Sequence, residues 1–283
     1  MGVGVGGWQM GEERVCVITG GGSGMGLEAA KILGQGRVVV LTGRTVAKLE
    51  HAVAELEAAG VEAHAHACDV SQRQSVRELA EYAAGLGRVT NVVHAAGVSP
   101  TMGTPEQMVR IDALGTVYVN QEFSRVMGAG SVIVDVASNS AYALPKILVS
   151  EKIYRLAELD ENTFVQRMLG RANLAHGEYE KAGFAYALSK NFAVWYAQKS
   201  AFDLGDKGIR VVSLSPGLIA TGMGKAEASH GDSMLKYGAE RRMGTPEELG
   251  FALATLADER NGYLAGVDVL VDGGCTNGRR FRK

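Results

Sequence analysis

The chain has 283 residues, of which 46% are hydrophobic and 21% are charged, and its formal net charge is −2. A chain of this length and composition can bury a full core as one large α/β domain. The small net charge gives no electrostatic reason to expect nucleic acid or an anionic membrane as a partner. No run of apolar residues approaches the roughly 18 that a membrane-spanning helix needs.

The cysteines and the N-terminal residues indicate the compartment. Cys16, Cys68 and Cys275 are too far apart for a disulfide framework or a zinc site, which fits a reducing cytoplasm. Residues 1–11 are rich in glycine and lack the basic start and apolar centre of a signal peptide. We therefore expect a flexible leader over 1–11, a single domain over 12–283, no bound metal and a cytoplasmic location.

Seven short apolar runs alternate with helical patterns along the chain. The runs are Val15–Ile18, Val38–Leu41, Val61–Ala65, Val89–Val93, Val132–Val136, Val211–Leu214 and Val267–Val271, and the helical patterns include Val46–Ala59 and Gln72–Ala84. Strands that are apolar on both faces and separated by helices indicate a doubly wound parallel sheet covered on both sides. Ligands of such sheets bind beyond the carboxyl ends of the strands, so we expect the functional residues just after each run.

The first run is followed by a glycine-rich loop, Thr19–Gly26, with the spacing T-G-x-x-x-G-x-G. Side chains at Gly20, Gly24 and Gly26 would block the approach of a pyrophosphate to backbone N–H groups, and the N-terminus of the following helix favours negative charge. Glycine-rich turns also serve chain geometry alone. The loop therefore predicts a nucleotide site only in combination with other motifs.

The second run ends in Thr42-Gly43-Arg44. We place Thr42 at the position where a site for NAD carries an acidic residue, and a nearby arginine suits the 2′-phosphate of NADP. An exposed arginine is also common without any function. On balance Arg44 favours NADP(H) over NAD(H).

The third and fourth runs end in small or polar residues. Asp69 is a candidate partner of the adenine amino group, or it caps the helix that begins near Gln72. The small residues of Ala95-Ala96-Gly97 would let the backbone approach a flat ring, or they form only a tight turn. We interpret His94 as a packed turn residue, because no second ligand stands at metal-binding spacing from it.

Three residues further along are candidates for catalysis. Ser138 follows the fifth run, while Tyr186 and Lys190, four positions apart, share one helix face. An ammonium beside a phenol lowers a pKa that starts near about 10, so Tyr186 could exchange a proton near neutrality. The alternative is that Tyr186 and Lys190 merely lie on a solvated helix face and have no catalytic role. The glycine loop and Ser138 favour the catalytic interpretation.

Taken together, these motifs resemble those of the short-chain dehydrogenase/reductases, from about Arg14 to Gly274. The matching segments are the Thr19–Gly26 loop, His94–Gly97 (N-N-A-G in the family), Ser138 with the Y-x-x-x-K pair Tyr186 and Lys190, the P-G segment Ser215–Thr221, and Asp272-Gly273-Gly274. The resemblance implies a Rossmann-like fold and an NAD(P)(H)-dependent oxidoreductase that interconverts a secondary alcohol and a ketone, as a homodimer or homotetramer. An enoyl reductase is disfavoured, because that branch spaces its tyrosine and lysine more widely.

The resemblance also implies roles for individual residues. Tyr186 exchanges the proton, Ser138 hydrogen-bonds the carbonyl oxygen, and Lys190 tunes Tyr186 and holds the nicotinamide ribose. The cofactor-binding residues that it implies are Gly20, Ser23, Gly24, Met25, Gly26, Arg44, Asp69, Val70, Ala95, Ala96, Gly97, Tyr186, Lys190, Pro216, Gly217, Ile219 and Thr221.

One residue departs from the family pattern. Asp112 stands where the family has an asparagine that holds a water of the proton relay. An ionised aspartate accepts hydrogen bonds but cannot donate them. Asp112 is therefore a candidate catalytic residue that reorients this water, or it merely supports its helix. It also leaves open an alternative function, a cofactor-sensing binding protein with little turnover.

The spacing between Ser138 and Tyr186 is longer than is usual in the family, which predicts an insert over about 143–180. Apolar residues recur at helical intervals within it, which predicts two short amphipathic helices: Val149, Ile153 and Leu156, then Phe164 and Met168. A segment this short cannot form its own core, so we expect it to build a wall of the substrate pocket or a subunit interface. The insert resembles that of bacterial 3α-hydroxysteroid dehydrogenase/carbonyl reductases, which makes a steroid or bulky alicyclic substrate one possibility.

The polar segment 221–243 lacks a long apolar face, and it ends at a capping box, Thr245-Pro246-Glu247-Glu248, that starts a helix. Its position directly after Thr221 predicts a mobile lid over the substrate rather than an inert surface loop.

Overall fold

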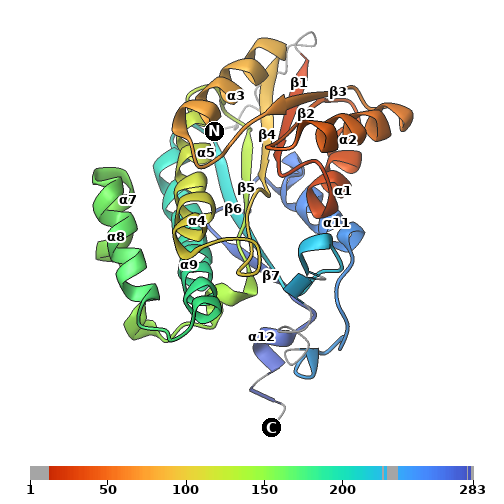
Figure 1. Ribbon diagram of the computed structural model, residues 1–283. Coiled ribbons are helices and arrows are strands. Elements are labelled where there is room, and N and C mark those ends of the chain that lie inside the picture. The colour runs from red at the N-terminus through yellow and green to blue at the C-terminus, as the bar shows by residue number, and fades with distance from the viewer. Residues whose placement is uncertain (1–12, 225, 228–234, 279, 282–283) are drawn as a thin grey trace, which may run out of the picture.

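A computed structural model describes residues 13–224, 226–227, 235–278 and 280–281 (Figure 1). The predicted leader, 1–11, lies outside the described residues, and so do positions 225 and 228–234 of the predicted lid. Among the described residues, no helix has the length and apolar character needed to span a bilayer.

The centre of the molecule is a parallel sheet of seven strands in the order β3-β2-β1-β4-β5-β6-β7. The strands are β1 (Arg14–Thr19), β2 (Val38–Gly43), β3 (Ala63–Ala67), β4 (Arg88–His94), β5 (Val132–Val136), β6 (Arg210–Pro216) and β7 (Asp268–Val271). Each coincides with a predicted run, although Val61 lies just before β3. The doubly wound, Rossmann-like fold is therefore confirmed. Its strand order reverses between β1 and β4, which is where such sheets bind ligands.

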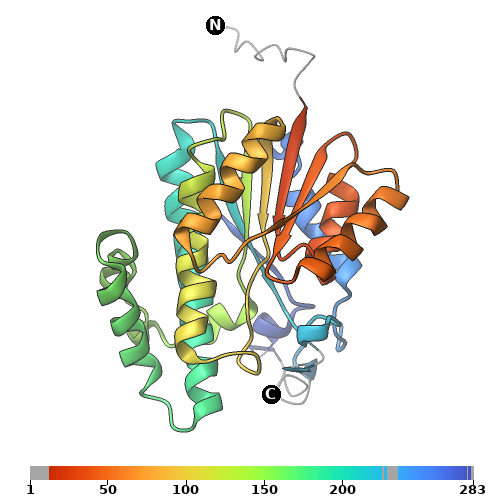
Figure 2. The ribbon, with the colours of Figure 1, turned by 45° about the horizontal axis from the view of Figure 1, so that its top comes forward.

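Helices cover both faces of this sheet, because apolar side chains of its inner strands point to both faces and are buried there. Val15 and Val17 of β1 pack in one buried cluster, Cys16 and Ile18 in the other. The first cluster is completed by α3 (Arg73–Leu86), α4 (Pro105–Met108), the π-helical turn η1 (Val109–Leu114), α5 (Gly115–Phe123) and α9 (Glu178–Gly205). The second is completed by α1 (Gly24–Leu33), α2 (Val46–Ala58) and α11 (Pro246–Leu256), which begins at the predicted capping box (Figure 2).

The predicted insert forms a layer outside α4 and α9 (Figure 1). It holds η3 (Lys146–Leu148), α6 (Glu151–Tyr154), α7 (Leu156–Leu159) and α8 (Glu161–Ala172). The second predicted helix, around Phe164 and Met168, is α8, whereas the first is divided at Arg155 into α6 and α7. The apolar residues on which the prediction rested, Val149, Ile153, Leu156, Phe164 and Met168, pack against the main core of the same chain, which the prediction did not name. Phe164 and Met168 are fully buried, and the Phe164 ring lies 5.0 Å from the ring of Phe192 in α9.

Short elements complete the described chain. They are η2 (Asn139–Tyr142), directly after β5, η4 (Glu259–Asn261), before β7, and α12 (Cys275–Gly278), after β7.

Candidate active site

The glycine loop joins β1 to α1 beside the turn that follows β4. A Cβ atom on Gly20 would lie 2.8 Å from the backbone of Ala95 and Ala96, and one on Gly26 would lie 2.9 Å from the carbonyl oxygen of Gly20. Gly24 has φ of +61°, which disfavours a side chain. Positions 20 and 26 therefore need glycine because the backbone packs closely there. The sequence had suggested only the approach of a pyrophosphate as the reason.

A cavity of about 460 Å³ runs along the carboxyl ends of β1, β2 and β4. Of the predicted cofactor residues it is lined by Gly20, Ser23, Gly24, Met25, Gly26, Arg44, Asp69, Val70, Ala95, Ala96, Gly97 and Thr221. Lys48, in the first turn of α2, also lines it and was not predicted. Lys48 stands only four positions after Arg44, and this spacing could have indicated a second positively charged side chain at the same end of the cavity.

Two predictions at this edge need correction. Thr42 is fully buried in β2 and does not line the cavity, whereas the next residue, Gly43, does. Successive side chains of a strand alternate between its two faces, so the position after Thr42 is the one that reaches the cavity. Asp69 lines the cavity but does not cap α3: its carboxylate accepts hydrogen bonds from the backbone N–H and the hydroxyl of Ser71.

His94 is a packed residue, as expected. It is buried, and its Nδ1 atom lies 2.8 Å from the Thr19 hydroxyl, which also accepts a hydrogen bond from the N–H of Ala96. Burial and the nearby charge of Lys190 lower the pKa of His94 to about 3, so the ring is neutral at pH 7. No group of metal ligands occurs among the described residues.

The three predicted catalytic side chains meet where β5 ends beside α9. Ser138 follows β5 and hydrogen-bonds the Tyr186 side chain. The Lys190 ammonium lies 5.7 Å from the centre of the Tyr186 ring and donates to the carbonyl oxygen of Val136. Tyr186 and Ser138 line a second cavity of about 270 Å³, together with the predicted residues Pro216, Gly217 and Ile219. Met25 and Thr221 line both cavities, which therefore adjoin.

The expected pKa shift of Tyr186 was wrong in sign. Burial raises the pKa of the phenol, and this effect outweighs the lowering by Lys190 and by the Ser138 hydrogen bond. The charges of Asp112 and Glu227 raise it further. Tyr186 is consequently protonated at neutral pH, a state suited to donating a proton. The sequence could not show this, because it does not reveal how deeply the ring lies.

Asp112 is buried beside Lys190, and its Oδ1 atom lies 3.5 Å from the ammonium and accepts a hydrogen bond from the N–H of Val98. Its Oδ2 atom is buried and has no hydrogen-bond partner among the described residues. Burial raises the pKa of Asp112 to about 6, against the attraction of Lys190. The π-helical turn that carries Asp112 is a common feature of functional sites. A Cβ atom on Gly97 would lie 2.7 Å from Oδ1, so glycine there permits this approach.

Two family models match parts of the chain. A family model described as short chain dehydrogenase matches residues 14–149, and one described as Enoyl-(Acyl carrier protein) reductase matches residues 170–276. The stretch between them, 150–169, contains α6, α7 and most of α8. These helices therefore lie in a stretch that neither family model matches.

Individual relatives are similar over almost their whole length. A short-chain dehydrogenase/reductase of Alternaria brassicicola is 29% identical, with 93% of this chain and 95% of the relative aligned. The 7α-hydroxysteroid dehydrogenase of Escherichia coli is 26% identical, with 92% and 93% aligned.

Solved structures share the fold. A short chain dehydrogenase from Burkholderia cenocepacia in complex with NADP has a TM-score of 0.73 at 24% identity, with 93% of this chain and 97% of that one covered. A short-chain dehydrogenase/reductase from Serratia marcescens reaches 0.74 at 22% identity, with 93% and 98% covered. The family is shown by the two family models, which match residues 14–149 and 170–276, and by the relatives aligned along nearly the whole chain: it belongs to the short-chain dehydrogenase/reductase family of oxidoreductases.

Proposed function

We propose that this protein is an NADP(H)-preferring carbonyl reductase or hydroxysteroid dehydrogenase, which interconverts a secondary alcohol and a ketone. The observation that supports this most directly is the meeting of Ser138, Tyr186 and Lys190 where the two cavities adjoin. A hydroxyl donor, a proton donor and an ammonium at one point are what the reduction of a carbonyl group requires.

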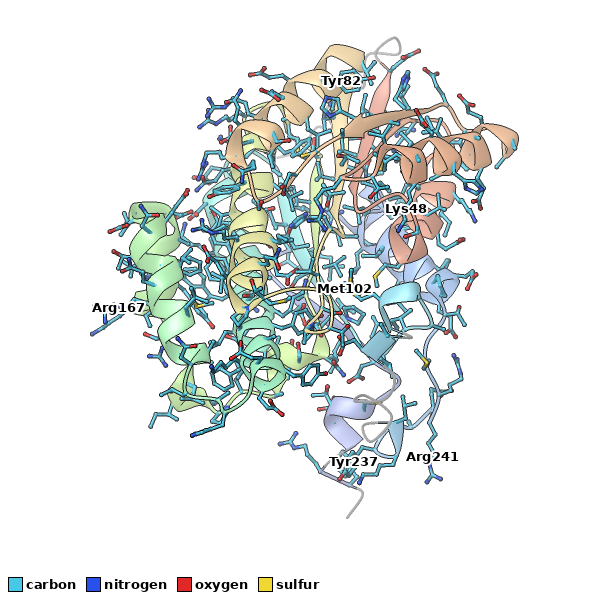
Figure 3. The ribbon with its side chains drawn as sticks, in the orientation of Figure 1. Lys48, Tyr82, Met102, Arg167, Tyr237 and Arg241 are labelled. Carbon is cyan, nitrogen blue, oxygen red and sulfur yellow. The ribbon has the colours of Figure 1, made fainter. Side chains whose placement is uncertain are left out.

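The first cavity fits a dinucleotide phosphate. The left-handed backbone of Gly24 opens α1, and the N-terminus of that helix favours an anion. Arg44 and Lys48, both exposed at the end of β2 and the start of α2, would hold a 2′-phosphate, which supports NADP(H) over NAD(H). Figure 3 shows Lys48 and Met102, both of which line this cavity. The bound cofactor supplies the hydride.

The chain's own residues then manage the proton. In the reducing direction the Ser138 hydroxyl donates a hydrogen bond to the carbonyl oxygen, which gains negative charge as hydride reaches the carbon. Tyr186, protonated at neutral pH, passes its proton to that oxygen, and the Lys190 ammonium stabilises the phenolate that remains. The alcohol leaves with the proton of Tyr186. Oxidation runs through the same steps in reverse.

Asp112 acts behind this group in our proposal. It holds the Lys190 ammonium, with Oδ1 at 3.5 Å, in the place of the family's asparagine. The alternative of a cofactor-sensing protein with little turnover is not favoured, because Ser138, Tyr186 and Lys190 are all present and close enough for Ser138 and Lys190 to act on the Tyr186 phenol.

Several expectations remain proposals. We infer a homodimer or homotetramer in the cytoplasm, and an alicyclic ketone or steroid as one possible substrate. The predicted lid is supported by Thr221, Met223, Gly224 and Glu227, which line the second cavity. Tyr179, which lies within the predicted insert, lines it too.

A panel of alicyclic and steroid ketones with NADPH or NADH tests the proposal. We expect the loss of reduced-cofactor absorbance with at least one ketone, faster with NADPH than with NADH. Binding of NADPH by calorimetry without turnover of any ketone would favour the sensing protein instead.

A further inference from the structure

The second cavity carries a charge whose role the proposed reaction does not explain. Among the described residues that line it, Glu227 alone bears a charge, and the others are apolar or neutral polar side chains such as Met223, Leu218, Asn139 and Ser140. A carboxylate is costly to desolvate, so its presence beside the reacting groups needs a reason.

The Glu227 carboxylate is held by two walls of the cavity. Oε1 accepts hydrogen bonds from the backbone N–H and the hydroxyl of Thr101, at 2.9 and 2.6 Å, and Oε2 accepts one from the Tyr179 hydroxyl at 3.0 Å. Thr101 lies between β4 and α4, and Tyr179 lies in the first turn of α9. Three segments far apart in the sequence thus converge on one carboxylate, which fixes its place in the cavity.

These contacts keep Glu227 ionised. Partial burial raises its pKa, but the hydrogen bonds from Thr101, Ser99 and Tyr179 together lower it by more, so the net shift is downward. The charge also reaches the reacting groups, because it raises the pKa of Tyr186. A substrate positioned at Tyr186 therefore lies within the field of a fixed negative charge.

We propose that Glu227 makes this cavity select ketones and alcohols whose remote end is neutral or cationic and carries hydrogen-bond donors, and reject those that end in a carboxylate. The inference rests on the proposed function and names its substrate class. A remote amide or hydroxyl donates to the carboxylate, whereas a second carboxylate meets like charge in a partly desolvated space.

A matched pair of substrates tests the selection. One is cyclohexanone with a carboxylate opposite the carbonyl group, and the other is the same ring with a carboxamide, which has nearly the same shape but no charge. For the wild type we expect kcat/KM with NADPH to favour the amide by about tenfold or more. In Glu227→Gln the acid should recover to within about threefold of the amide.

Two further variants separate charge from structure. Tyr179→Phe removes a hydrogen bond but keeps the charge, so it should still reject the acid. Glu178→Gln removes an equal charge from a side chain that is 86% exposed, and it should discriminate like the wild type. Equal use of acid and amide by the wild type would overturn the proposal. So would an unchanged ratio in Glu227→Gln, or a loss of discrimination in Tyr179→Phe.

A binding measurement tests the selection separately from catalysis. The affinities of the acid and the amide for the NADPH complex, measured by calorimetry, should show the same preference in the wild type and its loss in Glu227→Gln. Unsubstituted cyclohexanone reports on reduction alone. If the amide binds more tightly than the acid but no ketone is turned over, the proposed function is wrong and the role of Glu227 stands. If ketones are turned over but acid and amide bind equally, the role of Glu227 is wrong and the proposed function stands.

Discussion

At the scale of single residues, Arg44 decides the choice of cofactor in our account. A charged hydrogen bond contributes about 1.5–3 kcal/mol, so Arg44→Ala should weaken NADPH binding by that amount and leave NADH nearly unchanged. Lys48→Ala should act in the same direction. Calorimetric titration with both cofactors measures the effect, and Arg167→Ala, which changes a side chain that points away from the molecule in Figure 3, is the control. Equal losses for the two cofactors would remove Arg44 from the phosphate site.

Asp112 gives the stability of the protein a distinct pH dependence. Its pKa is about 6 in the folded protein, against an ordinary value of 3.8. The folded state therefore binds this proton at a pH where the unfolded chain does not. The resulting stabilisation is fully present below about pH 4 and is lost as the pH rises through about 6.

Asp112→Asn removes this dependence. The quantity to compare is the free energy of unfolding of the wild type minus that of Asp112→Asn. We expect this difference to fall by about 1 kcal/mol from about pH 5 to about pH 7. Urea denaturation at the two pH values measures it. Asp206→Asn alters an exposed carboxylate and should follow the wild type. A wild-type curve parallel to that of Asp112→Asn would show that Asp112 does not titrate in this range.

At the scale of elements, the insert is anchored to the main domain by buried rings and by acidic residues. Glu161, at the start of α8, accepts hydrogen bonds from Arg73 of α3 and Tyr118 of α5. Glu158, at the end of α7, accepts from Tyr196 of α9 and forms an ion pair with Lys199 at 2.9 Å. The insert is thus a fixed outer layer of the domain.

The ring of Phe164 should carry much of this attachment. Because it is fully buried against α9, Phe164→Ala should lower the free energy of unfolding by about 3–5 kcal/mol. Leu159→Ala, in the same layer but 80% exposed, should change it by less than about 0.5 kcal/mol. Thermal or urea denaturation compares them. A loss below about 1 kcal/mol for Phe164→Ala would mean that the insert adds little to the stability of the domain.

At the scale of the whole molecule, the fold could be predicted because local patterns determine it. Apolar runs on both faces and the T-G-x-x-x-G-x-G loop indicate strands and a turn with little dependence on distant residues. The grouping of Ser138, Tyr186 and Lys190 was predictable because Ser138 follows the carboxyl end of β5, while Tyr186 and Lys190, four positions apart, share one face of α9. What was missed depends on tertiary contacts: the partial burial of Tyr186, the ion pair of Asp112 with Lys190, and the place of Glu227 between Thr101 and Tyr179.

The insert also limits how subunits could assemble. It covers part of α9 with side chains of its own chain, so that part is closed to a second subunit. Large exposed apolar side chains elsewhere include Phe251 of α11, at 66%, and Tyr263 before β7. We predict more than one subunit by light scattering, and a lower mass for Phe251→Ser. A wild-type mass of one subunit would contradict this prediction.

The central claim is that Tyr186 exchanges the proton of a carbonyl reduction, and Tyr186→Phe tests it most directly. The substitution removes the hydroxyl and little surface, so NADPH affinity should stay nearly constant while kcat falls far below about a tenth of the wild-type value for every ketone that the wild type reduces. A variant that binds NADPH normally and keeps about a tenth of kcat or more would contradict the account.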